Sequence, residues 1–510
     1  MKNRFLLGAT MRFTLCLIAL LAPLAMLRAQ AIANGTYTLT PENAPALRLD
    51  DEGAKTTTGN PIDVYTANDT GAQNWTFSDT GVTPAGYYNL ATEGAYCLTA
   101  SGTTSGSIAV LDPCAGTSAQ AWEAVASGSN WVFHPASNTA LCLDVEQASS
   151  TSGTGVQVYT CNSTTAQSWA SAMTFTSTQA TNIWNSYNSA FYVANGGDAY
   201  YRKDQGGGQD TTDFWYNAEE LEMAVDRAQR SGSAGDKAIV TALVNGFDAT
   251  YGSAWTSYTI YNDDVMWACL AHLRAYFVTG STETAWAVEA ANNFNWVYNG
   301  GTGRSAPQYD STYGGGLWWT TDHSSTGTKN ACVNGPGALV GYYLSVIYPS
   351  GTGFLGQAQN MNNWERNTLV TSTGYVYDHT GSSGVTGYDL SYNAGTYIGA
   401  SYLLGNSSSA GLAATYFMDN NGILPDYGTG GGNDDGFNGI FMRWMALYMI
   451  DSGTQATYSN WLYNNAGAAL SVEDSSGLSW DDWSAATPSG GQYSWDCSPS
   501  VVALQVLPPN

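Results

Sequence analysis

The sequence has few basic residues and little charge overall. Its 510 residues include 16 Lys and Arg against 41 Asp and Glu, a formal net charge of −25, and charged residues make up only 11% of the chain. A surface of this sign repels phosphate backbones and acidic lipids. Nucleic acid and membrane surfaces are therefore excluded as expected partners, and so are polyanionic sugars such as pectate.

Long apolar runs are lacking too, apart from one near the N-terminus. Basic residues at positions 2, 4 and 12 precede the apolar run 13–27, and small residues follow it. This order is typical of a secretory signal peptide, and the apolar core is short for a membrane span. We expect residues 1–30 to be a signal peptide, the mature protein to be secreted and extracellular, and no membrane contact after cleavage.

Aromatic residues, in contrast, are abundant. The chain has 18 Trp, 33 Tyr and 14 Phe, together 13% of its residues. The apolar faces of neutral sugars stack on aromatic rings, so a chain poor in charge and rich in rings suits neutral carbohydrate. A large aromatic core explains the same composition, so composition alone does not decide between the two.

The first mature region, 32–175, contains a threefold repeat. The pattern Gln-x-Trp begins at Gln73, Gln120 and Gln167, with spacings of 120 − 73 = 47 and 167 − 120 = 47 residues. Equal periods across three copies indicate one supersecondary unit that occurs three times. Short alternating runs separated by residues typical of turns predict short strands in each unit.

Four cysteines lie within this repeat. The second unit has Cys97 and Cys114, the third has Cys142 and Cys161, and the first unit lacks both members. Joint absence is expected if the two members of a pair bond to each other. In an exported protein each pair can close one loop as a disulfide.

These residues resemble the ricin-B type β-trefoil, carbohydrate-binding module family 13. The resemblance implies an all-β domain over 32–175, in which a unit can carry a shallow sugar pocket. It implies pocket residues in the first and third units, namely Asp50, Tyr65, Asn68, Asp144, Tyr159 and Asn162. The second unit has Thr99 and Ala115 in place of the Asp and Asn, so we expect it not to bind. A trefoil that only packs, with these polar residues in turns, is the alternative.

From about residue 180 to 508 the pattern changes to apolar residues at helical spacing, separated by loops rich in Gly and Asn. Twelve such windows occur, near 180–194, 213–230, 235–249, 264–278, 281–297, 330–348, 355–371, 391–404, 408–420, 436–451, 453–467 and 494–506. No strand alternation stands out. The sequence therefore predicts an all-α (α/α)6 toroid over 180–508, with loops at one end forming a cleft.

Carboxylate pairs are the candidate catalytic groups, because glycosidases use two of them. Adjacent acids occur at Asp263-Asp264, Asp434-Asp435 and Asp481-Asp482. Asp and Asn before a helix also cap its free N–H groups and suit its dipole. Neighbouring residues in regular structure point apart. Spacing alone does not choose between these functions.

Several motifs in order resemble glycoside hydrolase family 76, the endo-α-1,6-mannanases and related fungal wall transglycosidases. They are Tyr261-Asn-Asp-Asp-Val-Met-Trp267, Gly315-Gly-Leu-Trp-Trp319, Thr328-Lys-Asn-Ala331 with Asn334-Gly-Pro-Gly337, Ser391-Tyr-Asn-Ala-Gly395 and Phe437-Asn-Gly-Ile-Phe-Met-Arg443. The resemblance spans about 180–505. It implies a retaining mechanism, with Asp263 as nucleophile and Asp264 as general acid/base. A neighbouring carboxylate raises the pKa of the acid/base by repulsion between like charges.

Beside this pair we expect Trp318, Trp319 and Tyr392 to be sugar platforms and Asn393 to be a polar contact. His272 is expected to pack. Cys269, Cys332 and Cys497 form an odd set without zinc-like spacing, so we expect no metal and no cofactor.

The leading hypothesis is a secreted, monomeric, endo-acting hydrolase of neutral α-mannan that its trefoil holds on the polymer. Two alternatives stay open. One is a cell-wall transglycosylase of the same fold. The other is a carbohydrate-binding protein without catalysis, since a fold does not guarantee activity.

Overall fold

The computed structural model describes residues 32, 35–68, 70–81, 86–92, 96–128, 130–211, 214–351, 353–428 and 435–508. The expected signal peptide at 1–30 and Asp434 lie outside the described residues. Within them, no helix combines the length and the apolar character that crossing a bilayer requires.

The N-terminal region consists of strands and has threefold symmetry. Six strands pair in a closed ring, in the order β1–β4–β5–β8–β9–β12–β1, and three hairpins, β2/β3, β6/β7 and β10/β11, pair with one another beside it. The strands are Gly35–Pro41, Leu47–Asp51, Asn60–Thr66, Trp75–Asp79, Tyr87–Thr92, Tyr96–Ala100, Ser107–Pro113, Ala121–Ser127, Asn130–Pro135, Leu141–Val145, Thr154–Thr160 and Trp169–Met173, numbered β1 to β12. Each of the three units contributes four strands, and six of the twelve strands close the ring, which confirms the predicted β-trefoil.

The Gln-x-Trp pattern holds each unit together by equivalent hydrogen bonds. The indoles of Trp75, Trp122 and Trp169 are fully buried and donate to backbone oxygens at 3.0, 2.9 and 3.1 Å. The glutamine two residues earlier bonds both to a backbone oxygen and to a backbone N–H, for example Gln167 to Thr160 and Asn162. The predicted disulfides Cys97–Cys114 and Cys142–Cys161 are formed.

The rest of the described chain is mainly helical. The twelve α-helices are Ser177–Phe191, Phe214–Ser231, Ala234–Tyr251, Asn262–Val278, Thr284–Asn299, Ala331–Ile347, Phe354–Thr368, Ser391–Leu403, Ser407–Asn420, Phe437–Ser452, Gln455–Ser471 and Ser494–Val506, numbered α1 to α12. Each predicted window overlaps one of them.

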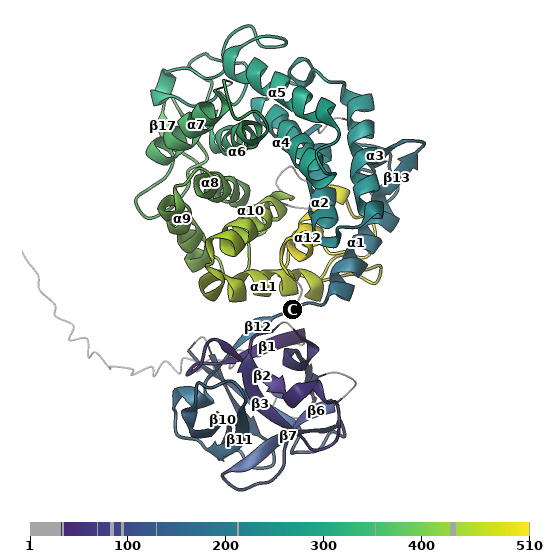
Figure 1. Ribbon diagram of the computed structural model, residues 1–510, viewed down its shortest axis with the longest axis vertical. Coiled ribbons are helices and arrows are strands. Elements are labelled where there is room, and N and C mark those ends of the chain that lie inside the picture. The colour runs from purple at the N-terminus through teal and green to yellow at the C-terminus, as the bar shows by residue number, and fades with distance from the viewer. Residues whose placement is uncertain are drawn as a thin grey trace, which may run out of the picture.

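Six helices form a closed ring in which each contacts the next, in the order α2, α4, α6, α8, α10, α12 and back to α2. The other helices lie outside this inner ring (Figure 1). The inner helices are buried around most of their surface, as a helix enclosed by others must be. Small residues allow this close approach: a Cβ on Gly395 of α8 would lie 2.7 Å from the Cα of Phe441 in α10.

Short strands that the sequence did not reveal interrupt the helices. A hairpin of β13 (Tyr192–Asn195) and β14 (Asp198–Tyr201) follows α1, and β15 (Lys329–Asn330), β16 (His379–Gly381) and β17 (Gly384–Thr386) form a small sheet. These strands have two to four residues, too few for alternation to be visible in the sequence.

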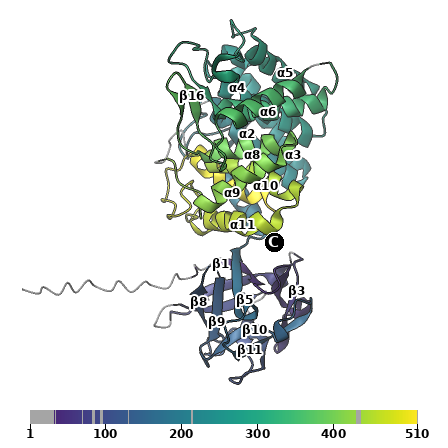
Figure 2. The ribbon, with the colours of Figure 1, turned by 90° about the vertical axis from the view of Figure 1, so that its left-hand side faces the viewer.

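The trefoil lies beside the ring, next to α11 (Figure 2). The Met173 N–H at the end of β12 donates to Asn464 Oδ1 in α11 at 2.9 Å, and Met173 packs on Gly467. Phe175 already belongs to the helical core, with its ring 5.9 Å from Tyr463. The change from β to α therefore occurs within a few residues of Met173.

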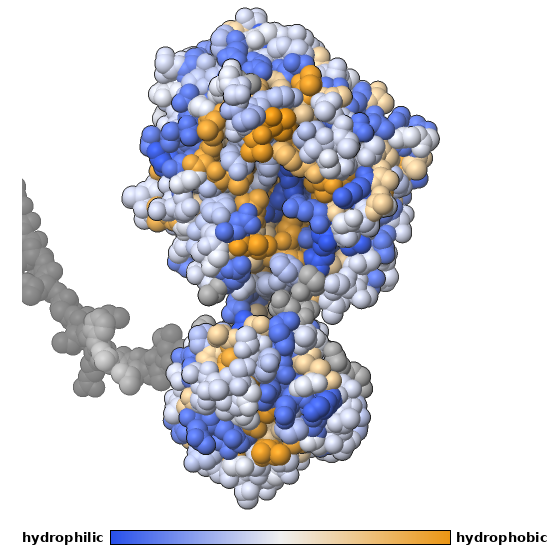
Figure 3. All heavy atoms as spheres, viewed as in Figure 1, coloured by the Kyte–Doolittle hydropathy of each residue, from blue (hydrophilic) through white to orange (hydrophobic). Residues whose placement is uncertain are grey.

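A buried ionic network joins α2, α4 and α10 inside the ring. Arg274 bonds to Glu222 and Asp226 at 2.6 Å each, and Arg443 bonds to Asp226 and Glu219 at 2.8 Å each. Both arginines line a pocket bordered by the last turns of α10 and α12. Figure 3 shows a hydrophilic hollow at the centre of the ring. Burial, together with Glu222, raises the pKa of Glu219 to about 8.

Replacing Arg443 with Met should destabilise the helical domain strongly, because Asp226 and Glu219 then lose a buried cationic partner. We expect the free energy of unfolding to fall by about 3–5 kcal/mol. Urea unfolding followed by tryptophan fluorescence measures this change. Lys237→Met, on the outside of α3, is the control and should change it by less than about 0.5 kcal/mol. Equal small effects would contradict the assignment of the network as a stabilising core.

Candidate active site

The first turn of α4 is fastened to the loop that precedes α6. Asn262 Nδ2 donates to the Trp318 oxygen at 2.8 Å, and its backbone N–H donates to the Trp319 oxygen at 2.7 Å. Arg304 Nε donates to Asn262 Oδ1 at 2.6 Å. Asn262 is fully buried, so these bonds fix the loop against the start of the helix.

The two aspartates that follow Asn262 have different partners. Asp263 Oδ2 accepts from Trp319 Nε1 at 2.9 Å and from the Cys332 thiol at 3.2 Å. Asp264 Oδ2 accepts from Thr259 Oγ1 at 2.9 Å. Both side chains are partly buried. Acids in the first turn of a helix also interact favourably with its dipole.

The protonation of Asp263 reflects its surroundings. Burial raises the pKa of Asp263 to about 6, while hydrogen bonds from Cys332, Trp319 and the helix backbone act in the opposite direction. Burial also lowers the pKa of Arg304 to about 10, against the charge of Asp264. The pair thus combines a carboxyl that titrates near neutrality with one that lies near a cation, although repulsion between the two acids is not the main cause of the Asp263 shift.

The two adjacent tryptophans of the loop differ sharply in exposure. Trp319 is 37% exposed and lies beside Tyr261, with ring centroids 5.2 Å apart, so it keeps a ring face near Asp263. Trp318 is only 2% exposed, stacks on His323 and donates to Asp310 at 2.8 Å. The prediction of a sugar platform is therefore wrong for Trp318, whose ring is used inside the loop.

Tyr392 and Asn393 also have other tasks than those predicted. The Tyr392 ring is 9% exposed and stacks on Phe437, with ring centroids 3.8 Å apart, so one of its faces is covered. Asn393 is fully buried, and its Nδ2 donates to Asp378 Oδ1 at 3.0 Å. Both side chains pack against neighbouring elements, since α8 is an inner helix enclosed by its neighbours.

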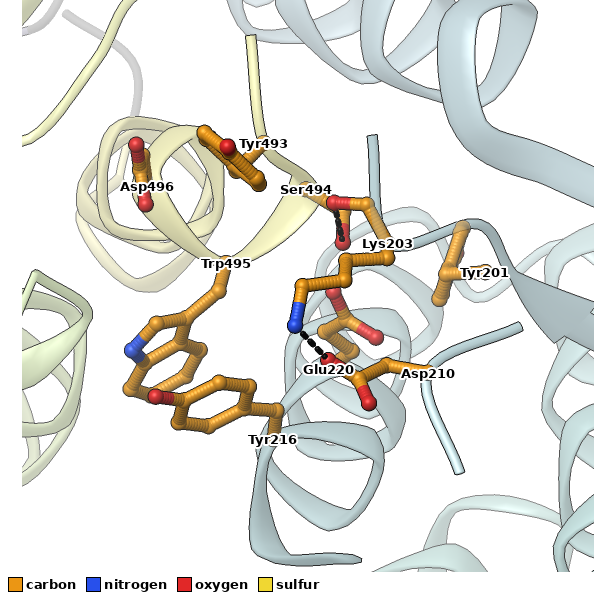
Figure 4. Close-up of a pocket in the computed structure, with 9 residues that line it drawn as sticks. All are labelled: Tyr201, Lys203, Asp210, Tyr216, Glu220, Tyr493, Ser494, Trp495 and Asp496. Atoms are coloured by element: carbon orange, nitrogen blue, oxygen red, sulfur yellow. Dashed lines mark hydrogen bonds and ion pairs between the residues drawn. The ribbon is translucent and has the colours of Figure 1, made fainter. Parts of the chain in front are cut away.

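A cluster of aromatic rings, here called the aromatic floor, lies at the starts of α2 and α12. Trp215 lies 6.4 Å from Trp267 on one side and 4.7 Å from Trp495 on the other, measured between ring centroids. Figure 4 shows Tyr216 stacked on Trp495, with centroids 4.9 Å apart, and Lys203 reaching Asp210 at 2.8 Å. Trp267 and Trp495 are 1% and 4% exposed, so Trp215 and Tyr216 keep the accessible surface of this floor.

The other acidic pairs lie elsewhere among the helix starts. Asp435 and Asp481 are buried, and burial together with the Asp435 and Asp496 carboxylates raises the pKa of Asp481 to about 9. Asp481 is therefore protonated at neutral pH. Asp482 Oδ1 accepts from the Ser484 N–H at 2.9 Å and forms a local turn.

In the trefoil, the expected pocket residues of the first and third units have matching places. Tyr65 and Tyr159 are 45% and 42% exposed, while Asp50 and Asp144 are buried. The oxygen Oδ1 of Asn68 accepts from Thr70, and that of Asn162 accepts from Thr164. In the second unit Thr99 bonds instead to Gln120 and Cys97.

The first and third units differ at one position. Gln157 Nε2 donates to Asp144 Oδ1 at 2.9 Å in the third unit. The first unit has Asp63 at this place, directly opposite Asp50. Burial and the Asp50 charge raise the pKa of Asp63 to about 7. A second carboxyl thus stands where the third unit has an amide.

Comparison with known families decides the identity of the larger domain. Residues 168–504 match the model of glycosyl hydrolase family 76, and residues 36–169 match that of the ricin-type β-trefoil lectin domain. The chain belongs to glycosyl hydrolase family 76. It is therefore a glycoside hydrolase with an N-terminal lectin-type domain.

Solved structures agree with this family in fold. The chain is similar to the GH76A α-1,6-mannanase of Salegentibacter sp. HEL1_6, with 24% identity, a TM-score of 0.56 and coverage of 64% of this chain and 98% of that chain. It is similar to a protein from Listeria innocua, with 21% identity, a TM-score of 0.54 and coverage of 64% and 96%. A GH76 α-mannanase of Bacteroides thetaiotaomicron has 16% identity, a TM-score of 0.52 and coverage of 64% and 94%. No curated protein matches the sequence significantly.

Sequence reasoning on the family 76 domain missed the residues that serve the Asp pair from other elements. They are Thr259, Arg304 and Cys332. A signal did exist for Cys332: it directly follows the start of a predicted helix, and the starts of inner helices meet at one end of a ring. Nothing in the sequence indicated Thr259 or Arg304, which lie in loops.

His272 and the three other cysteines lie in the core. His272 is fully buried, and its Nδ1 lies 2.8 Å from the Ala268 oxygen and its Nε2 3.2 Å from Asp248 Oδ1. Cys269, Cys332 and Cys497 are buried free thiols. Of the three, Cys332 contacts a carboxylate of the candidate site.

Asp63→Gln should stabilise the lectin domain of this family 76 enzyme at alkaline pH. Because the pKa of Asp63 is raised, its proton stabilises the folded form below the ordinary Asp pKa of about 4, and this contribution is lost as the pH rises through about 7. Gln restores the pairing of the third unit. We expect the melting temperature at pH 8.5 to rise by on the order of 2 °C over wild type. Calorimetry at pH 5 and 8.5 measures this, and a gain independent of pH would contradict the explanation.

Proposed function

We propose that this chain is a secreted, monomeric, retaining glycoside hydrolase that cuts α-1,6-mannan internally, held on the polymer by its trefoil. The ring of helices is then an (α/α)6 toroid with the cleft at the starts of the inner helices. The observation that carries the proposal is the pair Asp263 and Asp264 at the start of α4, with the exposed Trp319 ring bonded to Asp263.

Asp263 and Asp264 then have separate roles in two steps. Asp263 attacks the anomeric carbon while Asp264 donates its proton to the departing sugar oxygen, which leaves a glycosyl–enzyme ester. Asp264 next takes a proton from water, the water oxygen attacks the same carbon, and Asp263 departs as a carboxylate. Two inversions give net retention. The hydrogen bonds that Asp263 Oδ2 accepts favour its charged form, which both the attack and the departure require.

The choice of mannan is supported by the relatives. A variant of the Salegentibacter α-1,6-mannanase with two adjacent aspartates replaced by asparagine was solved in complex with α-1,6-mannotriose. The low charge of this chain and its aromatic floor suit the same neutral class of sugar. A secreted enzyme with a lectin-type domain is kept near an insoluble or branched polymer, which raises its effective concentration there.

Hydrolysis of linear, debranched α-1,6-mannan tests the proposal. The wild type should release short oligosaccharides, and proton NMR should show the α-anomer first. Asp263→Ala should lower kcat by at least about 1000-fold. Asp264→Ala should lower it by about 100- to 10,000-fold. Asp482→Asn is the matched control from another acidic pair and should leave the rate unchanged.

Azide, used with an aryl α-1,6-mannobioside as substrate, distinguishes the nucleophile from the general acid/base. The aryl leaving group of this substrate departs without being protonated. Azide can attack the glycosyl–enzyme without a general base, so it should restore turnover to Asp264→Ala with an α-linked azide as product. With Asp263→Ala, any azide product should be β-linked. Reversed configurations would exchange the roles, and no release from mannan by a folded wild type would sink the hydrolase assignment.

Binding of the chain to insoluble mannan tests the tether. Tyr65→Ala and Tyr159→Ala should each weaken binding about 3- to 30-fold, because each removes an exposed ring worth roughly 1–2 kcal/mol. Asp112 occupies the same position in the second unit: it lies one residue before the end of β7, as Tyr65 does in β3 and Tyr159 does in β11. Asp112→Ala is therefore the control and should bind like wild type. Wild-type binding by the double Tyr variant would remove the trefoil from the proposal.

A further inference from the structure

The Cys332 thiol stands apart from the other free cysteines of the described chain. Its Sγ lies 3.2 Å from Asp263 Oδ2, whereas Cys269 Sγ contacts a backbone oxygen, that of Ala290, at 3.4 Å. Buried cysteines usually act as small apolar residues. A thiol against a carboxylate that the family's chemistry requires calls for a different explanation.

The direction of this hydrogen bond follows from the groups around the sulfur. Burial holds the pKa of Cys332 well above its usual value, so the thiol keeps its proton at neutral pH. A carboxylate oxygen can only accept a hydrogen bond, so the S–H donates to Asp263 Oδ2.

We propose that Cys332 is a positioning residue for Asp263: its thiol donates to Oδ2 and favours the charged carboxylate needed for attack. This inference rests on the proposed function, because it takes Asp263 as the nucleophile.

Three neighbouring inner helices bring their first turns together around Asp263. Asp263 opens α4, Cys332 opens α6 and Tyr392 opens α8, and these three inner helices follow one another around the ring. Their first turns meet at one end. Trp319 supplies the second donor to the same oxygen from the loop before α6. Two donors from two elements fix the orientation of the carboxylate, which a single one leaves free to rotate.

Other charged and titratable groups also face this carboxylate, and the test must allow for them. Asp264 follows it on α4 and lies near Arg304. Asp378 interacts with both Cys332 and Tyr392, and it pairs with His379 at 2.7 Å. None of them bonds to Asp263 Oδ2. A change confined to the thiol therefore isolates one donor while these charges stay in place.

The experiment compares the pH dependence of kcat/KM on linear α-1,6-mannan for Cys332→Ala, Cys332→Ser and wild type. Loss of the donor should move the acidic limb of the Ala variant to higher pH by about half to one pH unit. The Ser variant keeps a donor, so its limb should lie at or below that of wild type.

Cys269→Ala is the matched control, since it removes a buried thiol from α4 that does not touch Asp263, and its limb should coincide with that of wild type. Superimposable profiles for Ala, Ser and wild type would overturn the inference. Equal displacement of the Ala and Ser variants would overturn it too, because packing alone then explains the effect.

A second measurement separates this inference from the proposed function. Infrared difference spectra between each chain and its Asp263→Asn derivative report the protonation of that carboxyl without any turnover. A higher titration midpoint in Cys332→Ala than in wild type and Cys332→Ser supports the role of the thiol as a donor to Asp263, even if mannan is not the substrate. Identical midpoints in all three refute that role, even if mannan is cut.

Discussion

Hydrogen bonds of one buried amide hold together the end of the ring that carries Asp263 and Asp264. Asn262 binds the backbone of Trp318 and Trp319 and accepts from Arg304, while the helix that it opens carries the two aspartates. A buried amide of this kind is costly to leave unpaired, so helix and loop have one arrangement relative to each other. The indole donor reaches Asp263 only because of that arrangement. The geometry of the Asp pair is thus set by the residue before it.

Many carboxyl groups are buried inside the ring, and the fold accommodates several of them in their protonated form. Burial raises the pKa of Glu220 to about 8, that of Asp389 to about 7 and that of Asp481 to about 9. An ionised carboxylate in an apolar site is costly unless a cation pairs with it, and cations are scarce in this chain. Arg274 and Arg443 pair with Glu219, Glu222 and Asp226 inside the ring. Asp263 instead accepts two side-chain hydrogen bonds on one oxygen, which favours its charged form.

Repetition and periodicity predicted the fold well, because both are local properties of the sequence. The Gln-x-Trp spacing of 47 residues reflects three equivalent sets of hydrogen bonds, and the helical windows reflect burial of one helix after another. The site was less predictable. Trp318 and Trp319 are adjacent aromatic residues in one loop, and the contacts of Lys329 and Asp310 with the first decide which ring is buried. Such contacts join residues that no pattern in the sequence relates.

The role of Tyr392 shows how a ring architecture changes the meaning of a motif. In sequence, a Tyr-Asn pair near the start of a helix suggests a sugar platform and a polar contact. In an inner helix, however, the first turn faces its neighbours in the ring before it faces the cleft. The Tyr392 ring therefore stacks on Phe437, and the Asn393 amide donates to Asp378. The motif is better explained by packing between neighbouring elements of the ring, whereas Trp319 in the loop before α6 keeps an exposed ring beside Asp263.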